Sequence, residues 1–490
     1  MKITLLRKLS LTYILIPNLL FSFGWFRQPY SGILIAGFIF LLIRELKKKN
    51  EPDFLPAKDL FFTLLFAIVW TFFSGAGGLS DQKSDFFAHN AKFYDLYKNP
   101  WPTYFPEVGR YACYYFGYYL VPSFLGKITG DLSPSFIYFW SVLGYFLGFS
   151  WVYLLIGRKK VGLFAFLWFR GIGYVLCLAL QKSHIMNIPL YRPVINGIVQ
   201  QSSYAPNQFL GTLIVTCILI HDVFVRKEFK EIWFPITLVF IWSVFPSISL
   251  SIIYLIVWVR HFIIKQNYMT LCNWSSLASF ILPAILLLPT LGYFLSANQT
   301  TVKGLLWQFG DPFKISFYHF TGIMIDLVVY FLLIRSLKHR EKLIPFWFTA
   351  SLLTTLFVFS LYRVGFHNDW FYRTQIPIFI ILVIVLIRGA YDCVEEKLLP
   401  AGWLNRSLSL LIVIMMFIQL SAYVHLLRDN IIVKTLFPSA TSFKPMPYDR
   451  FPNVYLLMKK MYQDRGDAEQ YLGQKNSFYE LHLAPKTDKN

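Results

Sequence analysis

The sequence predicts an all-α polytopic membrane protein, and two observations carry this prediction. Hydrophobic residues make up 56% of the 490-residue chain and charged residues only 15%, compared with about 25% charged residues in an average soluble domain. Apolar runs of about 17–25 residues, each long enough to cross a bilayer, recur along the chain. The net charge of +20 then belongs to loops that set topology, and we exclude nucleic acid as a partner.

About thirteen transmembrane helices are expected from these apolar runs. The weakest pair is 232–247 and 248–263, which only "WSVFPSISL" separates. The predicted helices lie at 9–26, 30–46, 60–77, 134–156, 161–180, 208–224, 232–247, 248–263, 275–295, 316–334, 343–361, 373–389 and 405–425.

The distribution of basic residues predicts the orientation of these helices. With a cytoplasmic N-terminus, the inner loops include 44–59, 157–160 and 225–231. The inner loops hold Lys and Arg more densely than the outer loops, as the positive-inside rule requires. The tyrosine-rich segment 111–126 must then stay at the outer surface without crossing, because a crossing would move two of these basic loops outside.

This topology divides the chain into three parts. Residues 1–59 form an N-terminal helical hairpin with a cytoplasmic loop, and residues 60–425 form a transmembrane bundle with a large outer loop at 78–133. Residues 426–490 form a short extracytoplasmic tail. Acids, histidines and amides concentrate in the outer loops, whereas the inner loops are short and basic. We therefore expect the functional site at the extracytoplasmic face.

The outer loop at 78–133 holds the first group of candidate residues. If 82–96 is helical, Asp85 and His89 share one face. There they suit a catalytic general base or the binding of a divalent cation such as Mg²⁺ or Mn²⁺, and Asn90 beside them is a candidate for substrate binding. The alternative is structural: Ser84 or Asp85 caps a short helix on the membrane surface and His89 is merely solvated.

A second group lies in "LYRVGFHNDWFYR" (361–373). Arg363, His367 and Arg373 give this loop positive charge, and arginine binds phosphate through two parallel hydrogen bonds. The alternative is interfacial anchoring, and Asp369 favours it because a carboxylate four residues from Arg373 could neutralise that arginine. Further candidates for substrate binding are polar side chains of the same outer face: Asn207, Gln208, Asn368 and Asp369.

One charged residue lies inside an apolar run. Arg170, in "FLWFRGIGY", costs about 2.5–3.5 kcal/mol on insertion scales if it lies at mid-membrane. It must therefore face a polar cavity or a partner, and Asp326 is the acid deep enough in the bundle to pair with it. Arg170 is kept as a candidate for substrate binding.

Several motifs resemble one group of membrane enzymes. "DFFAHNAKFYDLYKNPWP" and "YYFGYYLVPSFLGK" resemble bacterial multi-spanning predicted glycosyltransferases of the GT-C type, in which "D-x-x-x-H-N-A" precedes "YY-x-x-YYL-x-P". "WSVFPSISL", "NDWFYRTQIP" and "QYLGQKNSFYELHL" are also similar to that group. The resemblance covers most of the chain and implies a GT-C-like bundle. Two departures are a single Asp85 in place of an adjacent acidic pair, and "WFRGIGY" in place of "F-S-G-x-D".

The resemblance implies transfer of a sugar from a polyprenyl-phosphate donor to a glycan, lipid or protein acceptor. Asp85 would take the acceptor proton, and Arg373, together with His367 or Arg363, would stabilise the leaving phosphate. Asn207 and Gln208 would hydrogen-bond the sugar or the acceptor. Two alternatives stay open: a flippase or transporter of lipid-linked sugars, which needs polar residues along a path through the bilayer, and a glycan ligase or polymerase with the same site chemistry.

Overall fold

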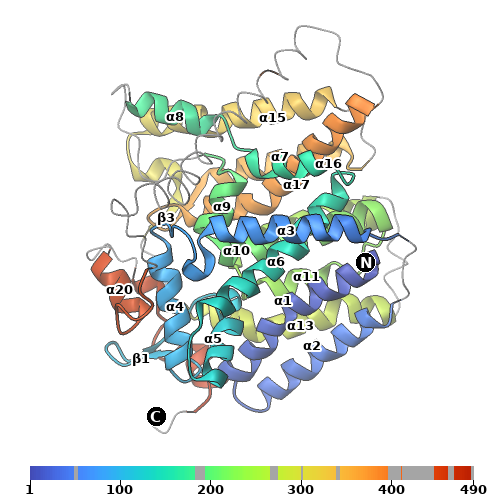
Figure 1. Cartoon of the computed structure of the whole chain (residues 1–490). Coiled ribbons are helices and arrows are strands. Elements are labelled where there is room, and N and C mark those ends of the chain that lie inside the picture. The colour runs from blue at the N-terminus through green and yellow to red at the C-terminus, as the bar shows by residue number, and fades with distance from the viewer. Residues whose placement is uncertain are drawn as a thin grey trace, which may run out of the picture.

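The computed structural model describes residues 1–48, 53–182, 194–264, 274–298, 302–337, 343–395, 410, 446–461 and 468–486. The described part is mostly helical (Figure 1). Its α-helices are α1 (Ile3–Trp25), α2 (Tyr30–Leu46), α3 (Ala57–Ser74), α4 (Phe86–Lys98), α5 (Gly117–Thr129), α6 (Pro134–Leu155), α7 (Lys160–Trp168), α8 (Gly173–Lys182), α9 (Ile198–Tyr204), α10 (Pro206–Ile220), α11 (Trp233–Val239), α12 (Val244–Trp258), α13 (Trp274–Leu295), α14 (Pro312–His319), α15 (Ile325–Ser336), α16 (Phe346–Ser360), α17 (Asp369–Glu395) and α20 (Val454–Met461).

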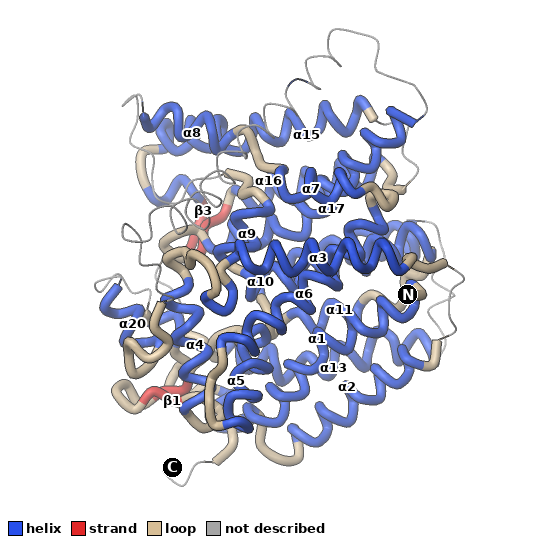
Figure 2. The backbone as a smooth tube through the Cα atoms, in the orientation of Figure 1, coloured by secondary structure: helices blue, strands red, loops and turns tan. Residues whose placement is uncertain are grey.

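Strands contribute little to the fold (Figure 2). β1 (Tyr104–Phe105) pairs antiparallel with β2 (Arg110–Tyr111), and β3 (Lys303–Leu305) pairs antiparallel with β4 (Tyr362–Val364). The second pair joins two loops that are far apart in the sequence, and β4 lies directly before α17. This pairing therefore fixes where the first turn of α17 begins.

Eight helical segments in the described residues are long and apolar enough to cross a bilayer. This confirms a polytopic, all-α membrane protein. The eight segments are Ile3–Trp25, Ala57–Ser74, Pro134–Leu155, Pro206–Arg226, Val244–Ile264, Ala278–Leu295, Pro312–Ser336 and Asp369–Glu395, and each overlaps one of the predicted spans.

The predicted count of thirteen spans is not supported, and four of the five differences have a structural reason. The predicted helix at 161–180 is interrupted between α7 and α8, where Phe169 is extended. Only α11, of 7 residues, forms at the start of 232–247, because the chain leaves the helix before Ser243. α2 has the predicted bounds, but its 17 residues are at the lower limit of a span, and α16 has only 15 residues. The predicted span 405–425 lies outside the described residues except for residue 410.

The bundle has two chemically different ends. Figure 1 shows α4, α5 and α20 gathered at one end and the N-terminus at the opposite end. α5 has 13 residues, which is about 20 Å at 1.5 Å per residue and too short for a hydrocarbon core of about 30 Å. Its length is that expected of a surface segment. Every residue of α10 is buried, and α10 packs against α6 and α17, so α10 lies at the centre of the bundle.

The C-terminal segment, described over 446–461 and 468–486, returns to the end that holds α4. Residues 471–474 lie between 111–113 and 296–298: Cys113 N donates to Tyr471 O (2.8 Å), and Asn298 N donates to Leu472 O (2.7 Å). One hydrophobic core contains residues of the predicted hairpin, bundle and tail alike. The described tail is therefore built into the bundle rather than attached to it.

Asp95 fastens the start of α20 to α4, and its removal tests this attachment. The buried carboxylate accepts from Val454 N at 2.8 Å. Loss of a buried hydrogen-bond partner costs about 1–3 kcal/mol, so Asp95→Ala is expected to open the C-terminal segment more often. Tryptic cleavage after Lys459 and Lys460 should accelerate severalfold, as followed by mass spectrometry.

The exposed Asp131 provides the matched control for this experiment. Asp131→Ala is expected to leave the cleavage rate at the wild-type value. Equal cleavage rates for Asp95→Ala and wild type would show that the hydrogen bond to Val454 does not hold the segment in place.

Candidate active site

A cavity of about 350 Å³ lies at the α4 end of the bundle. Five parts of the chain line it: α4, the segment between β2 and α5, the α9–α10 junction, the start of α17 and the C-terminal segment. Its polar lining includes Ser84, Asp85, His89, Lys92, Tyr114, Tyr115, Tyr204, Asn207, Gln208, His367, Asp369, Tyr372, Arg373, Gln470 and Tyr471. The polar residues that were predicted to concentrate in these loops thus line one partly open cavity.

The carboxylate of Asp85 faces the cavity and has only one weak hydrogen bond within the described residues. It occupies the residue before α4, but its side chain caps no backbone N–H, so the structural alternative predicted for it does not apply. Ser84 Oγ, at 3.4 Å, is a weak donor to it. Burial raises the pKa of Asp85, while Arg373 and Lys92 oppose the rise. A carboxylate in this setting can accept a proton from a ligand.

His89 lies beside Asp85, but hydrogen bonds occupy both of its ring nitrogens. Nδ1 lies 2.6 Å from Tyr119 Oη and Nε2 lies 2.9 Å from Tyr204 O. Because a carbonyl can only accept, Nε2 carries the proton and Nδ1 accepts from the tyrosine. Burial lowers the pKa of His89 to about 3, so the ring is neutral. In this arrangement His89 positions α4 and offers no lone pair to a cation.

A metal centre is also not assembled elsewhere in the described part of the chain. No group of three or more His, Cys, Asp or Glu side chains there could hold an ion. The predicted pair of Asp85 and His89 therefore does not fit the proposed Mg²⁺ or Mn²⁺ ion, and no step of the chemistry is derived through one.

The carbonyl of Tyr204 is free to accept from His89 because Pro206 separates α9 from α10. Pro206 begins α10 at the first helical position, where its missing N–H costs nothing. Gln208 N bonds Ala205 O instead of the carbonyl four residues back, which leaves Tyr204 O for His89. The same break places Asn207 and Gln208 in the first turn of α10, at the wall of the cavity.

Asn207 and Gln208 both line the cavity, but they differ in their hydrogen bonds. Gln208 Nε2 donates to Tyr115 Oη, and Gln208 Oε1 accepts from Ser243 Oγ, both at 2.8 Å. Asn207 is 1% exposed, and neither its amide nitrogen nor its amide oxygen has a hydrogen-bond partner. Buried amides are nearly always paired. Asn207 therefore has a donor and an acceptor without partners at the cavity wall, whereas Gln208 supports Tyr115.

Arg373 projects into the cavity from the second turn of α17. Its Nη1 donates to Gln201 Oε1 at 3.3 Å, and its Nε lies 4.0 Å from Asp369 Oδ1. The predicted pairing with Asp369 is therefore loose, and that carboxylate is itself 36% exposed. His367 also lines the cavity. Arg373 retains donors for an anion.

Three other predicted residues have structural roles outside the cavity. Arg363, in β4, donates to Phe366 O at 2.5 Å and so closes the turn before α17. Asn368 takes a left-handed conformation with φ of 57°, and its Oδ1 accepts from Phe371 N as a helix cap. Asn90 donates to Gln82 Oε1 and Met446 O. None of the three lines the cavity.

Arg170 likewise lies away from the cavity, at the break between α7 and α8. It is 6% exposed, and its guanidinium lies over the ring of Tyr174. Asp326 Oδ1 accepts from Gly173 N at 3.1 Å. A side chain on Gly173 would collide with the backbone of Gly322, so glycine is needed where these segments touch. The predicted partners thus shape a helix break.

Several residues of the cavity were not among the predicted candidates. Lys92, Tyr114, Tyr115, Tyr471 and Met458 all line it. Lys92 follows Asp85 and His89 on the same helical face, which was the available signal for that residue. Tyr471 and Met458 come from the C-terminal segment, and no local pattern in the sequence predicts that this segment returns to the cavity.

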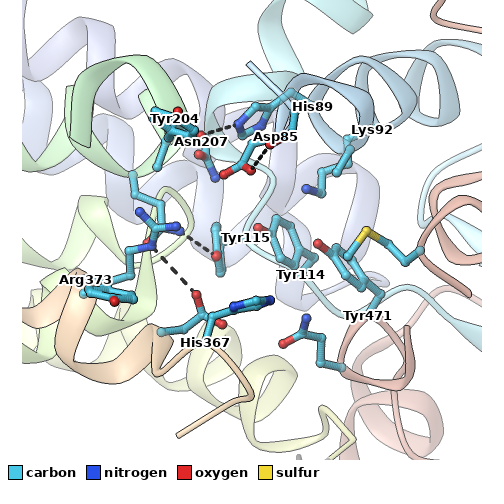
Figure 3. A pocket seen from close by; sticks show the side chains of 18 of the residues that line it. Asp85, His89, Lys92, Tyr114, Tyr115, Tyr204, Asn207, His367, Arg373 and Tyr471 are labelled. Atoms are coloured by element: carbon cyan, nitrogen blue, oxygen red, sulfur yellow. Dashed lines mark hydrogen bonds and ion pairs between the residues drawn. The ribbon is translucent and has the colours of Figure 1, made fainter. Parts of the chain in front are cut away.

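Figure 3 shows the resulting arrangement, with Asp85 between Arg373 on one side and Lys92 on the other. A carboxylate, a guanidinium, an ammonium and an unpaired amide surround one space. Comparison with known proteins gives no match to a family model, a curated protein or a solved structure.

Proposed function

We propose that the protein is an integral-membrane glycosyltransferase of the GT-C type. In this proposal it moves a sugar from a polyprenyl-phosphate donor to a hydroxyl of a glycan, lipid or protein acceptor. The observation that carries the proposal is the cavity in which the weakly engaged Asp85 carboxylate and the Arg373 guanidinium meet. The cavity opens at the end of an apolar bundle, which suits a substrate with a lipid tail and a polar head.

The proposed reaction uses these groups in one displacement. The acceptor hydroxyl gives its proton to Asp85 as its oxygen forms a bond to the anomeric carbon. The bond from that carbon to the phosphate oxygen breaks, and the phosphate leaves with the bonding electron pair. Arg373, with His367 nearby, stabilises the charge on the departing phosphate. Asn207 hydrogen-bonds a hydroxyl of the sugar or the acceptor.

The proposed site faces the extracytoplasmic side of a bacterial inner membrane. Support comes from the opposite end of the bundle, where basic side chains gather near the N-terminus. Acids at this end pair with some of them, as in Arg158–Asp53, Lys48–Glu231 and Lys159–Glu395, but the sequence segments 44–59, 157–160 and 225–231 hold more Lys and Arg than Asp and Glu. A basic end is the cytoplasmic end under the positive-inside rule, so the cavity and the described C-terminal segment lie outside.

A flippase or transporter of lipid-linked sugars is the second candidate, and one observation favours it. Transporters often use discontinuous helices near the centre of the bilayer, and α7 and α8 are separated by such a break, with Arg170 and Asp326 buried beside it. However, Asp326 Oδ1 already accepts from the backbone of α8. A glycan ligase or polymerase would use the same cavity with a larger donor.

The proposal is tested with purified protein in liposomes that contain radiolabelled polyprenyl-phosphate sugars and a membrane extract as the acceptor source. Label that appears in acceptor material, at the expense of the donor, supports glycosyl transfer. Label that stays on the donor while the donor crosses the bilayer would contradict transfer and support the flippase.

Arg373→Gln is expected to lower kcat/KM for the donor by about 10- to 100-fold. Hydrogen bonds to charged groups contribute about 1.5–3 kcal/mol, and each 1.4 kcal/mol is a factor of ten. The measurement is a donor titration in the same assay. Arg388→Gln is the matched control, because Arg388 lies near the other end of the same helix and pairs with Asp392. An Arg373→Gln enzyme as active as this control would exclude phosphate recognition by Arg373.

A further inference from the structure

Lys92 is buried against aromatic rings at the edge of the cavity. The residue is 2% exposed, and its ammonium nitrogen lies 4.3 Å from the ring centre of Tyr114, 5.1 Å from that of Tyr471 and 5.5 Å from that of Tyr119. Tyr114 stacks on Tyr471, with ring centres 4.8 Å apart. Three parts of the chain therefore build the surface that holds this one cation.

The carboxylates near Lys92 do not form an ion pair with it. Within the described residues no carboxylate oxygen lies within 4.0 Å of its nitrogen. Asp95, one turn further along α4, instead accepts from the backbone of Val454, and Asp85 faces the cavity. Electron-rich ring faces stabilise an ammonium but do not neutralise it. Burial lowers the pKa of Lys92 to about 7, although Asp85 and Asp95 raise it. A ligand anion would complete the environment.

Lys92 and Arg373 lie at different sides of Asp85 (Figure 3). The Arg373 side is formed by α17 and α9, and the proposed function places the donor phosphate there. The Lys92 side is bounded by Met458, Met461 and Tyr471 of the C-terminal segment. A group that gives its proton to Asp85 must approach from the side that the donor does not occupy, which is the side of Lys92.

We propose that Lys92, on its platform of Tyr114 and Tyr471, binds an anionic group of the acceptor. The acceptor class would then be a glycan or glycolipid that carries a carboxylate or a phosphate close to the reacting hydroxyl. The anion subsite follows from the burial and contacts of Lys92. That its ligand is the acceptor rests on the proposed function. It also gives the C-terminal segment a role in acceptor selection.

The test is competitive acetylation of the full-length wild-type protein in detergent. A trace of acetic anhydride is added at neutral pH, and the acetylation rate of each lysine is measured by mass spectrometry. The probes are methyl glucuronide and methyl glucoside, which differ by a carboxylate. At a glucuronide concentration about ten times its Kd, acetylation of Lys92 should slow about tenfold, while the glucoside leaves it unchanged. The exposed Lys475 is the internal control, and neither probe should alter its rate.

Equal effects of the two sugars on Lys92, or no effect of either, would overturn the proposal. Protection by undecaprenyl phosphate in place of the glucuronide would also overturn it, because Lys92 would then serve the donor. Failure of this proposal and failure of the proposed function can be distinguished, because protection of Lys92 and sugar transfer are measured independently. Transfer without protection of Lys92 leaves the glycosyltransferase and removes the anion subsite, whereas protection without transfer leaves the subsite and removes the reaction.

Discussion

Asp85→Asn is expected to lower kcat for sugar transfer by about 10²- to 10⁴-fold, which is the usual contribution of a general base. The amide keeps the size of the side chain but cannot take the acceptor proton. Asp85 caps no backbone N–H, so the substitution should leave α4 intact. Donor binding, measured separately by equilibrium binding of labelled donor, should persist because Arg373 is unchanged.

Asp81→Asn is the matched control for this substitution. Asp81 lies four residues earlier and pairs with Lys83 at 2.7 Å, and it does not line the cavity. The control should transfer sugar at the wild-type rate. Because a base must be ionised, wild-type transfer should fall as the pH falls, and since burial raises the pKa of Asp85, that fall should begin above the range of an ordinary aspartate. Equal rates for the two variants would remove Asp85 as the base.

Arg7→Met is expected to have the largest effect on stability. Arg7, in α1, donates to Asp222 Oδ2 at 3.0 Å and pairs with Glu45 of α2, and all three side chains are almost fully buried. Removal of the cation breaks two buried ion pairs and, within the described residues, leaves Glu45 only Lys48 and Asp222 only Arg226 as lysine or arginine partners. Breaking a buried pair costs about 3–5 kcal/mol. The expected result is a lower melting temperature in detergent and a lower yield of folded protein.

Two further variants check the mechanism of this loss. Lys2→Met removes an exposed positive charge at the same end and should leave the melting temperature unchanged. Arg7→Met combined with Glu45→Gln and Asp222→Asn should recover part of the stability, because no buried carboxylate then lacks Arg7, while Lys48 and Arg226 keep Glu231 as a partner. A single Arg7→Met variant that melts with the wild type would show that the buried ion pairs do not stabilise the bundle.

The membrane class and most of the spans were predictable because hydrophobic length is a local property. The apolar runs that became α1, α3, α6 and α17 could be placed from the sequence alone. The break between α7 and α8 could not, because it depends on Asp326 and on backbone packing against Gly322, which lie far along the chain. Hydropathy records the length of an apolar run and not the contacts that interrupt it.

The candidate site was predictable in part, for a similar reason. Asp85, Asn207 and Arg373 were candidates from composition and position, and the fold brings all three to one cavity. Arg363 could not be separated from them in the sequence, because it lies in an equally polar loop and only the structure shows that it closes a turn there. The role of Lys92 depends on Tyr471, a distant residue that only the return of the C-terminal segment places beside it.

Filling the cavity with a bulky group shows directly whether sugar transfer occurs there. Ala88, on α4, lines the cavity, and Ala88→Cys provides an attachment point for a bulky thiol reagent. Before labelling, this variant should transfer sugar at close to the wild-type rate. After complete labelling, confirmed by mass spectrometry, transfer should be abolished, while wild-type protein treated with the same reagent stays active. Undiminished transfer by the fully labelled variant would show that sugar transfer does not occur in this cavity.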